Sequence, residues 1–171
     1  MNPDLSSNVV LDESGLATYL HAHEAGSHAG EGVAKRLLGR DDLDAAAKAF
    51  LREFVVQIRV ERAHVTSLLE RLESDQSLVR RAFQAAATVA DMVGRVAALP
   101  APRPFSDLEA LAIGVWGKRL LWGALIELSD VDERIAKLPL AELTDQAERQ
   151  EIELLRIRSD AIVPSLTAKR S

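Results

Sequence analysis

The chain has 171 residues, of which 47% are apolar and 27% charged, and its formal net charge is −5. This balance is typical of a single globular domain and not of a disordered segment. The absence of cysteine excludes disulfide frameworks, thiolate metal sites and cysteine nucleophiles. A negative net charge and an aromatic content of 4% argue against nucleic-acid binding.

The sequence also contains no signal that would direct the chain to a membrane. No uncharged apolar run approaches the roughly 18 residues that a membrane-spanning helix needs. The first 14 residues lack the early basic residues and the apolar segment of a secretory signal. We therefore expect a cytoplasmic protein that contacts neither membrane nor nucleic acid.

Helix-forming residues dominate the whole chain, and alternating strand patterns are absent, so the sequence predicts an all-α fold. We expect residues 1–12 to be disordered or loosely packed, 13–164 to form one helical domain, and 165–171 to fray. Five helices are predicted, at residues 13–38, about 42–72, about 77–99, 106–128 and 139–163.

Local residues indicate where these helices begin and end. Asp41 or Asp42 is placed to cap the second helix. Ser106 with Glu109 three residues later has the pattern of a capping box that opens the fourth. Pro164 is expected to end the fifth, because proline removes a backbone donor.

Four of the five helices carry long apolar stripes at three-four spacing, which is typical of bundles of long helices. Short links make the first two helices, and the last two, antiparallel hairpins. About 30 residues, including the predicted helix 77–99, separate the two hairpins. This pattern predicts a ferritin-like four-helix bundle with an additional crossover helix, and a plain up-down five-helix bundle is the alternative.

Each long stripe is interrupted near its middle by one polar residue. A charge at a core position is costly unless it is paired, so the four residues are expected to meet in one layer. One interpretation is a buried Glu61–Lys118 ion pair that fixes helix register. Another is a pocket for a small polar ligand or a remnant of a metal site, and a third is that the stripes are misphased and some members face water. The four residues are His23, Glu61, Lys118 and Gln150.

A metal site is the alternative hypothesis for the first two helices. Glu61 and His64 have the E-x-x-H spacing that places a carboxylate and an imidazole on one helix face in di-iron bundles, and His21 and Glu24 lie at similar heights. Such a site would take iron, manganese or zinc. Two observations oppose it: the last helix has no histidine, and the ammonium of Lys118 would be repelled by bound cations.

Three segments resemble an uncharacterised family of small all-helical proteins from actinobacteria. They are residues 19–26 (YLHAHEAG), residues 108–118 (LEALAIGVWGK) with Trp122, and residues 147–150 (AERQ) with Arg156. The resemblance implies a ferritin-like bundle and no established activity. In that family the positions of Glu24 and His64 look apolar, whereas those of the four-residue layer look polar.

The leading hypothesis is therefore a non-enzymatic bundle without a cofactor that acts through protein association as a homodimer. Its polar layer would be structural or would bind a small ligand of unknown identity. The second hypothesis is a metal-binding ferritin-like protein that uses the histidine and glutamate residues of the first two helices, with an oxidoreductase as its candidate activity.

Overall fold

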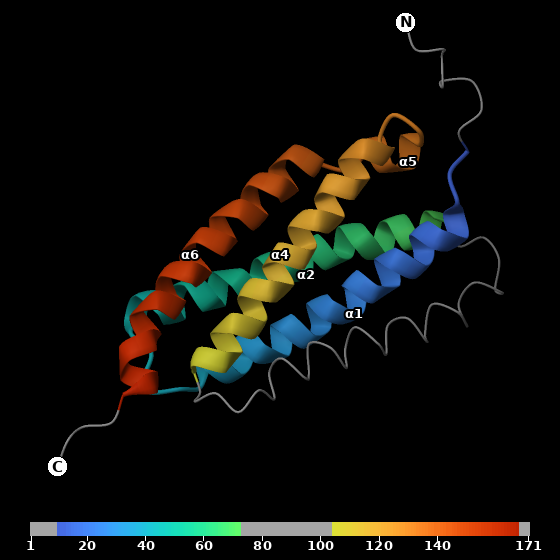
Figure 1. The fold of residues 1–171 in the computed structure, drawn as a ribbon. Coiled ribbons are helices and arrows are strands. Elements are labelled where there is room, and N and C mark those ends of the chain that lie inside the picture. The colour runs from blue at the N-terminus through green and yellow to red at the C-terminus, as the bar shows by residue number, and fades with distance from the viewer. Residues whose placement is uncertain (1–9, 73–103, 168–171) are drawn as a thin grey trace, which may run out of the picture.

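A computed structural model describes residues 10–72 and 104–167, and within these ranges every regular element is helical. Four long helices and one short helix follow one another along the chain (Figure 1). The all-α prediction is confirmed for this part of the chain. The predicted helix at 77–99 lies outside the described residues, as does most of the expected loose segment 1–12. The helices are α1 (Glu13–Leu38), α2 (Ala45–Leu72), α4 (Phe105–Leu128), α5 (Glu133–Ala136) and α6 (Leu140–Leu166).

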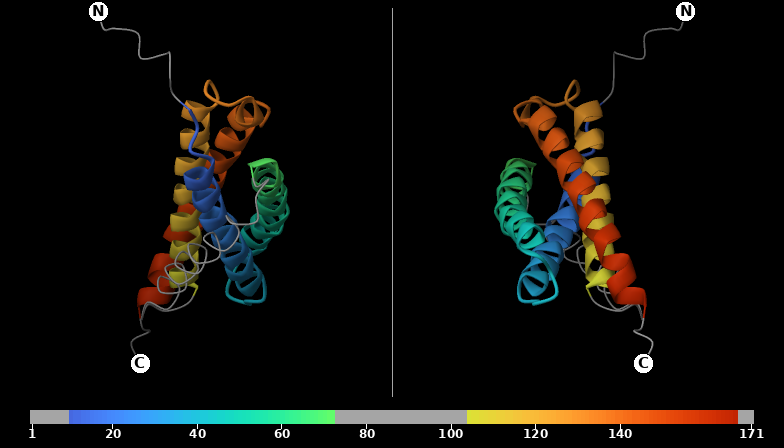
Figure 2. Two further views of the ribbon diagram at one scale, coloured as in Figure 1. Left: turned by 90° about the vertical axis from the view of Figure 1, so that its right-hand side faces the viewer. Right: turned by 90° about the vertical axis from the view of Figure 1, so that its left-hand side faces the viewer.

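The long helices form two antiparallel hairpins that pack on each other. The two most extensive contacts are α1 with α2 and α4 with α6, and α1 against α4 joins the hairpins. The α1–α2 turn and the α4–α6 connection lie at opposite ends of the molecule (Figure 2). As a result, α2 and α4 run in the same direction (Figure 1).

The start of α2 differs from the prediction. Asp44, and not Asp41 or Asp42, caps this helix, because its carboxylate accepts the backbone N–H of Ala47 at 2.7 Å. Asp42 instead accepts two hydrogen bonds from Arg40, at 2.8 and 2.6 Å. The sequence pattern does not distinguish these three aspartates as helix caps, because all lie within four residues. The path of the turn decides which of them caps α2.

The predicted capping box of α4 is also wrong. Pro104 occupies the cap position without a side-chain hydrogen bond, and Ser106 lies inside the first turn with 1% exposure. Glu109 accepts a hydrogen bond from Arg158 of α6 at 2.6 Å instead of capping its own helix. Arg158 of α6 has therefore taken the place that the capping box with Ser106 was expected to give to the Glu109 carboxylate.

Two further boundaries depend on tertiary packing. The expected loop after α4 contains α5, whose Ile135 is fully buried. The last helix continues through Pro164 to Leu166 instead of ending before the proline. The described residues contain no helix that is both long enough and apolar enough to span a membrane.

The core consists of two apolar clusters, one at each end of the bundle. On α2 the boundary between them falls between Ile58 and Val65, and on α4 between Val115 and Leu121. On α6 the boundary falls between Ala147 and Leu154. The predicted polar residues of these three helices occupy that boundary.

Candidate functional site

The boundary between the two core clusters is a layer of hydrogen-bonded polar side chains. Lys118 Nζ on α4 lies 2.6 Å from Glu61 Oε2 on α2, and it also donates to Gln150 Oε1 on α6. The Glu61 side chain is 3% exposed and that of Lys118 12%. Three of the four predicted residues therefore meet in the interior.

Two glutamines that the sequence analysis did not single out complete the layer. Gln146 Nε2 donates to Glu61 Oε1 at 2.6 Å. Gln150 Nε2 donates to Gln57 Oε1 at 2.7 Å and to Glu61 Oε1 at 3.3 Å. Gln57 precedes Glu61 by four residues, and Gln146 precedes Gln150 by four, so helical spacing was a signal for both.

The electrostatics of the layer are those of a desolvated ion pair. Burial lowers the pKa of Lys118 below its usual 10.5, and the Glu61 carboxylate opposes part of that shift. The ammonium also lies 5.6 Å from the centroid of the Phe54 ring, within range of a cation–π interaction. Every described partner of Glu61 is a donor: Lys118 neutralises its charge, and Gln146 and Gln150 add hydrogen bonds from neutral amides.

His23 lies beside this network and takes no part in its described hydrogen bonds. Its ring meets the edge of Tyr19, with centroids 4.6 Å apart and planes at 80°. Burial lowers the pKa of His23 below 6.5, which favours the neutral imidazole. The expectation that His23 would satisfy groups of the layer is therefore replaced by a position in the wall of an adjacent cavity.

That cavity exists because α1 presents mostly small side chains at the level of the layer. Its buried residues stop at Leu20 and resume at Glu31. The interval instead presents small residues: Ala22, Gly26, Ser27 and Gly30. These small side chains do not fill the space between the helices, so a void of about 320 Å³ remains between α1, α2 and α4.

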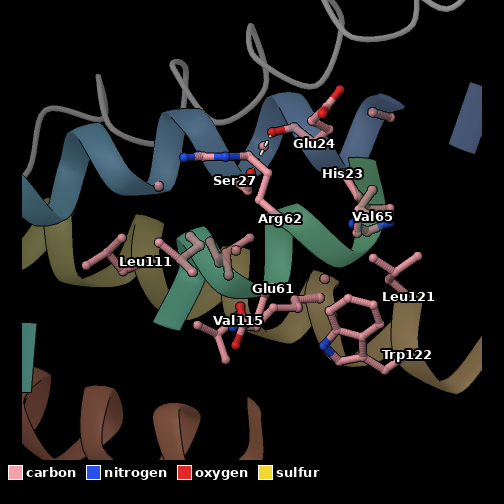
Figure 3. Close-up of a pocket in the computed structure, with 18 of the residues that line it drawn as sticks. His23, Glu24, Ser27, Glu61, Arg62, Val65, Leu111, Val115, Leu121 and Trp122 are labelled. Atoms are coloured by element: carbon pink, nitrogen blue, oxygen red, sulfur yellow. Dashed lines mark hydrogen bonds and ion pairs between the residues drawn. The ribbon is translucent and has the colours of Figure 1, made fainter. Parts of the chain in front are cut away.

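The walls of the cavity are mostly apolar, with a few polar groups (Figure 3). The lining includes the exposed Ile113 and Gly114 as well as the buried Val115 and Trp122. The cavity therefore extends from the surface of α4 into the core, next to Glu61 and Lys118. This size and composition are typical of small-molecule sites.

Two side-chain nitrogens in the cavity walls are buried without a hydrogen-bond partner. They are Trp122 Nε1 on α4 and Arg62 Nη1 on α2. The Trp122 indole nitrogen is on the side of the ring that faces Glu61 and Val115 (Figure 3). A buried donor without an acceptor is unfavourable, so each of these atoms is suited to contact a ligand or water.

Arg62 also belongs to a charged cluster that joins α1 to α2. Its Nη2 donates to Glu31 Oε2 at 2.8 Å, and Arg59 and Lys35 bind Oε1 of the same carboxylate, each at 2.7 Å. Hydrogen bonds from Arg59, Lys35 and Arg62 hold the pKa of Glu31 well below its usual range. This cluster was not predicted, because none of its members interrupts an apolar stripe and only Glu31 among them is buried.

The four residues of the metal hypothesis do not converge. Glu24 lies 3.5 Å from His21 Nδ1 and accepts a hydrogen bond from Thr66 at 2.6 Å, whereas Glu61 is bound by Lys118. His64 is half-buried and is not part of either group. Residues 10–72 and 104–167 contain no group of three or more His, Asp or Glu side chains placed to hold a metal ion.

Comparison with known proteins provides no family for this chain. No family model, no curated protein and no solved structure matches it. The resemblance to the actinobacterial helical family therefore remains a prediction from the sequence.

Proposed function

We propose that this protein binds a small, largely apolar molecule in the cavity between α1, α2 and α4. The observation that supports this function is the coincidence of a void of about 320 Å³ with unpartnered donors and a polar layer. A cavity of about 150 Å³ already binds benzene, so this one has room for a molecule of about two fused rings. Void space of this size is costly to the fold, and a bound ligand would recover the lost contacts.

The test uses two glycines of α4 that differ only in their relation to the cavity. A Cβ atom at either Gly117 or Gly123 would meet no atom within 4 Å, but only Gly117 lines the cavity. Gly117→Leu should therefore weaken the binding of tetralin, a bicyclic hydrocarbon probe, by at least about tenfold, because the leucyl side chain takes its place. Gly123→Leu is the matched control and should bind tetralin as the wild type does.

Binding would be followed by chemical-shift changes of backbone amides during a tetralin titration. The expected result is a set of shifts centred on Gly30, Gly114 and Gly117 in the wild type and the control, and a titration midpoint at least about tenfold higher in Gly117→Leu. Absence of shifts at millimolar tetralin, or equal binding by all three proteins, would contradict the proposed function.

The finer fold assignment belongs to the same proposal. Parallel α2 and α4 helices, each in an antiparallel hairpin, are the arrangement of bundles with one long crossover connection. This direction supports a ferritin-like bundle over an up-down five-helix bundle. The cytoplasmic location also remains a prediction.

Self-association is a second candidate function, favoured by one face of α4. Ile113, Trp116 and Leu120 are 46%, 55% and 50% exposed, and their three-four spacing places them on one face of the helix. An exposed apolar stripe is typical of a protein contact. We propose a second copy of this chain as its partner, because an isologous interface lets the same stripe pack against itself.

A further inference from the structure

The polar end of the cavity has more hydrogen-bond donors than the described groups around them accept. Trp122 is 1% exposed, and its Nε1–H has no acceptor. Lys118 lies one helical turn earlier on α4, and its ammonium has three donors, of which Glu61 and Gln150 accept two. Both side chains line the cavity, so two donors without a described acceptor lie at its wall.

Each side-chain oxygen of Glu61 and Gln150 already accepts at least one hydrogen bond from the protein. Glu61 Oε1 accepts from Gln146 and Gln150, and Oε2 accepts from Lys118. The side-chain oxygen of Gln150 also accepts from Lys118. A ligand group that only donates would share these oxygens with protein donors and would leave the indole N–H unsatisfied.

The charge of the layer is balanced before any ligand enters. Glu61 and Lys118 neutralise each other in an environment from which water is largely excluded. A ligand carboxylate placed there would be a second buried anion for one cation, and a buried unpaired charge is strongly unfavourable. The layer therefore favours an uncharged acceptor.

From these three observations we infer the ligand class: an apolar, ring-sized molecule whose polar end is an uncharged carbonyl or ether oxygen that accepts the Trp122 Nε1–H. This inference rests on the proposed function, because it specifies the chemistry of the same cavity. The apolar body occupies the space beside α1, and the oxygen lies at the α4 end of the polar layer.

The test compares three probes of similar size: 1-tetralone, tetralin and 1-naphthoate. Tetralone differs from tetralin by a carbonyl in place of one CH₂, so their affinity ratio isolates the acceptor. We expect tetralone to bind about tenfold more tightly than tetralin, since it satisfies a buried donor. Trp122→Phe keeps an aromatic ring without the N–H and should bring the ratio close to one.

A direct readout does not depend on the folding of that variant. The chain has two tryptophans, and Trp116→Phe leaves Trp122 as the source of the single indole N–H resonance. Trp116 does not line the cavity, so this variant is also the matched control and should keep the tetralone preference. Tetralone should move the Trp122 indole proton downfield, and tetralin should not.

The outcomes separate this inference from the proposed function. Equal affinity for tetralone and tetralin with an unmoved indole resonance would overturn the acceptor assignment and leave the cavity as a binding site. Tightest binding of naphthoate, lost in Arg62→Met, would show that an anion at Arg62 is recognised instead. Failure of all three probes to bind would overturn the proposed function itself, and this inference with it.

Discussion

At the scale of single residues, burying either Lys118 or Glu61 alone would cost free energy. Burying the two together costs much less, because their charges neutralise each other. Glu61 accepts hydrogen bonds from side chains of α4 and α6. Among its described partners, only Lys118 carries a positive charge. Such a pair adds little net stability over an apolar pair, but removing one partner leaves an uncompensated charge. The Glu61–Lys118 pair therefore acts mainly by specifying how the helices pack, and it adds little to the free energy of unfolding.

Removing the charge of Lys118 alone should be much worse than removing both charges. Lys118→Met is expected to lower the free energy of unfolding by about 3 kcal/mol, because Glu61 then remains charged and unpaired. Addition of Glu61→Leu should restore most of that loss. Urea denaturation of the two single variants and the double variant completes the cycle.

An exposed ion pair provides the contrast for this cycle. Arg156→Met breaks an exposed contact with Glu153 on α6 and should leave the denaturation midpoint almost unchanged. If Lys118→Met behaved like this control, the layer would not be an energetic unit.

Glu31 predicts how stability changes in acid. Its pKa in the folded protein is below 4.5, so its charge stabilises the fold above pH 4.5, and that contribution is lost as the pH falls further. Glu31→Gln should remove about 1 kcal/mol of this acid-dependent stability, after allowance for screening of partly solvated charges. Thermal unfolding between about pH 6 and pH 3 measures the difference.

The matched control is Glu70→Gln, which changes an exposed glutamate of the same helix pair. Its unfolding profile should follow that of the wild type throughout. A Glu31→Gln profile parallel to the wild type would show that the three basic residues contribute no pH-dependent stability through Glu31.

At the scale of the helices, the main feature is the contrast between α1 and its three neighbours. Helices α2, α4 and α6 each bridge the two apolar clusters with a long polar side chain that joins the layer, whereas α1 crosses the same level mostly with alanine, serine and glycine, and its His23 stays outside the layer. A Cβ atom at Gly30 would come within 3.4 Å of Ile58 Cδ1, so α1 approaches α2 closely there. The same small residues that permit this approach leave the cavity toward α4.

The start of α2 can be tested with neighbouring aspartates. Asp44→Ala should lower the free energy of unfolding by about 1 kcal/mol, because the first turn loses its acceptor for the Ala47 N–H. Asp41→Ala removes an exposed carboxylate of the same turn and should change stability by less than about 0.5 kcal/mol. Chemical denaturation of both variants would show whether Asp44 alone is the cap; equal losses would contradict this assignment.

At the scale of the whole molecule, two hairpins with turns at opposite ends enclose the polar layer and the cavity. The layer connects both hairpins, since Glu61 lies in the first and Lys118 and Gln150 in the second. The exposed α4 stripe lies at the surface, where its Ile113 also borders the cavity, and it favours association between molecules.

The predicted homodimer depends on that stripe. Trp116→Glu should convert a particle with the mass of two chains into one with the mass of a single chain, because the symmetry places two new charges in one interface. Light scattering measures the mass, and circular dichroism should show unchanged helix content. Ile152→Glu changes an apolar side chain of α6 that is 69% exposed and is the control, which should stay dimeric. A single-chain mass for the unaltered protein would contradict the prediction.

The sequence by itself determined the features that repeat along a helix. Apolar stripes predicted the long helices, and their single polar interruptions predicted the contact of Glu61, Lys118 and Gln150, because one residue in each stripe must face the core at a given height. The predicted bounds of the first helix, residues 13–38, are also those of α1. Gln57 and Gln146 carried the same kind of signal, four residues from a layer member.

Only the tertiary structure decided contacts between groups that are equivalent in the pattern. In the structure, Asp44 caps α2 instead of Asp41 or Asp42. Glu109 accepts a hydrogen bond from Arg158 of another helix, and His23 lies beside the layer instead of within it. It also left Trp122 Nε1 without an acceptor beside a void. A void is a property of the space between three helices, and periodicity along one helix describes only which side faces inward, not how closely the neighbouring helices approach.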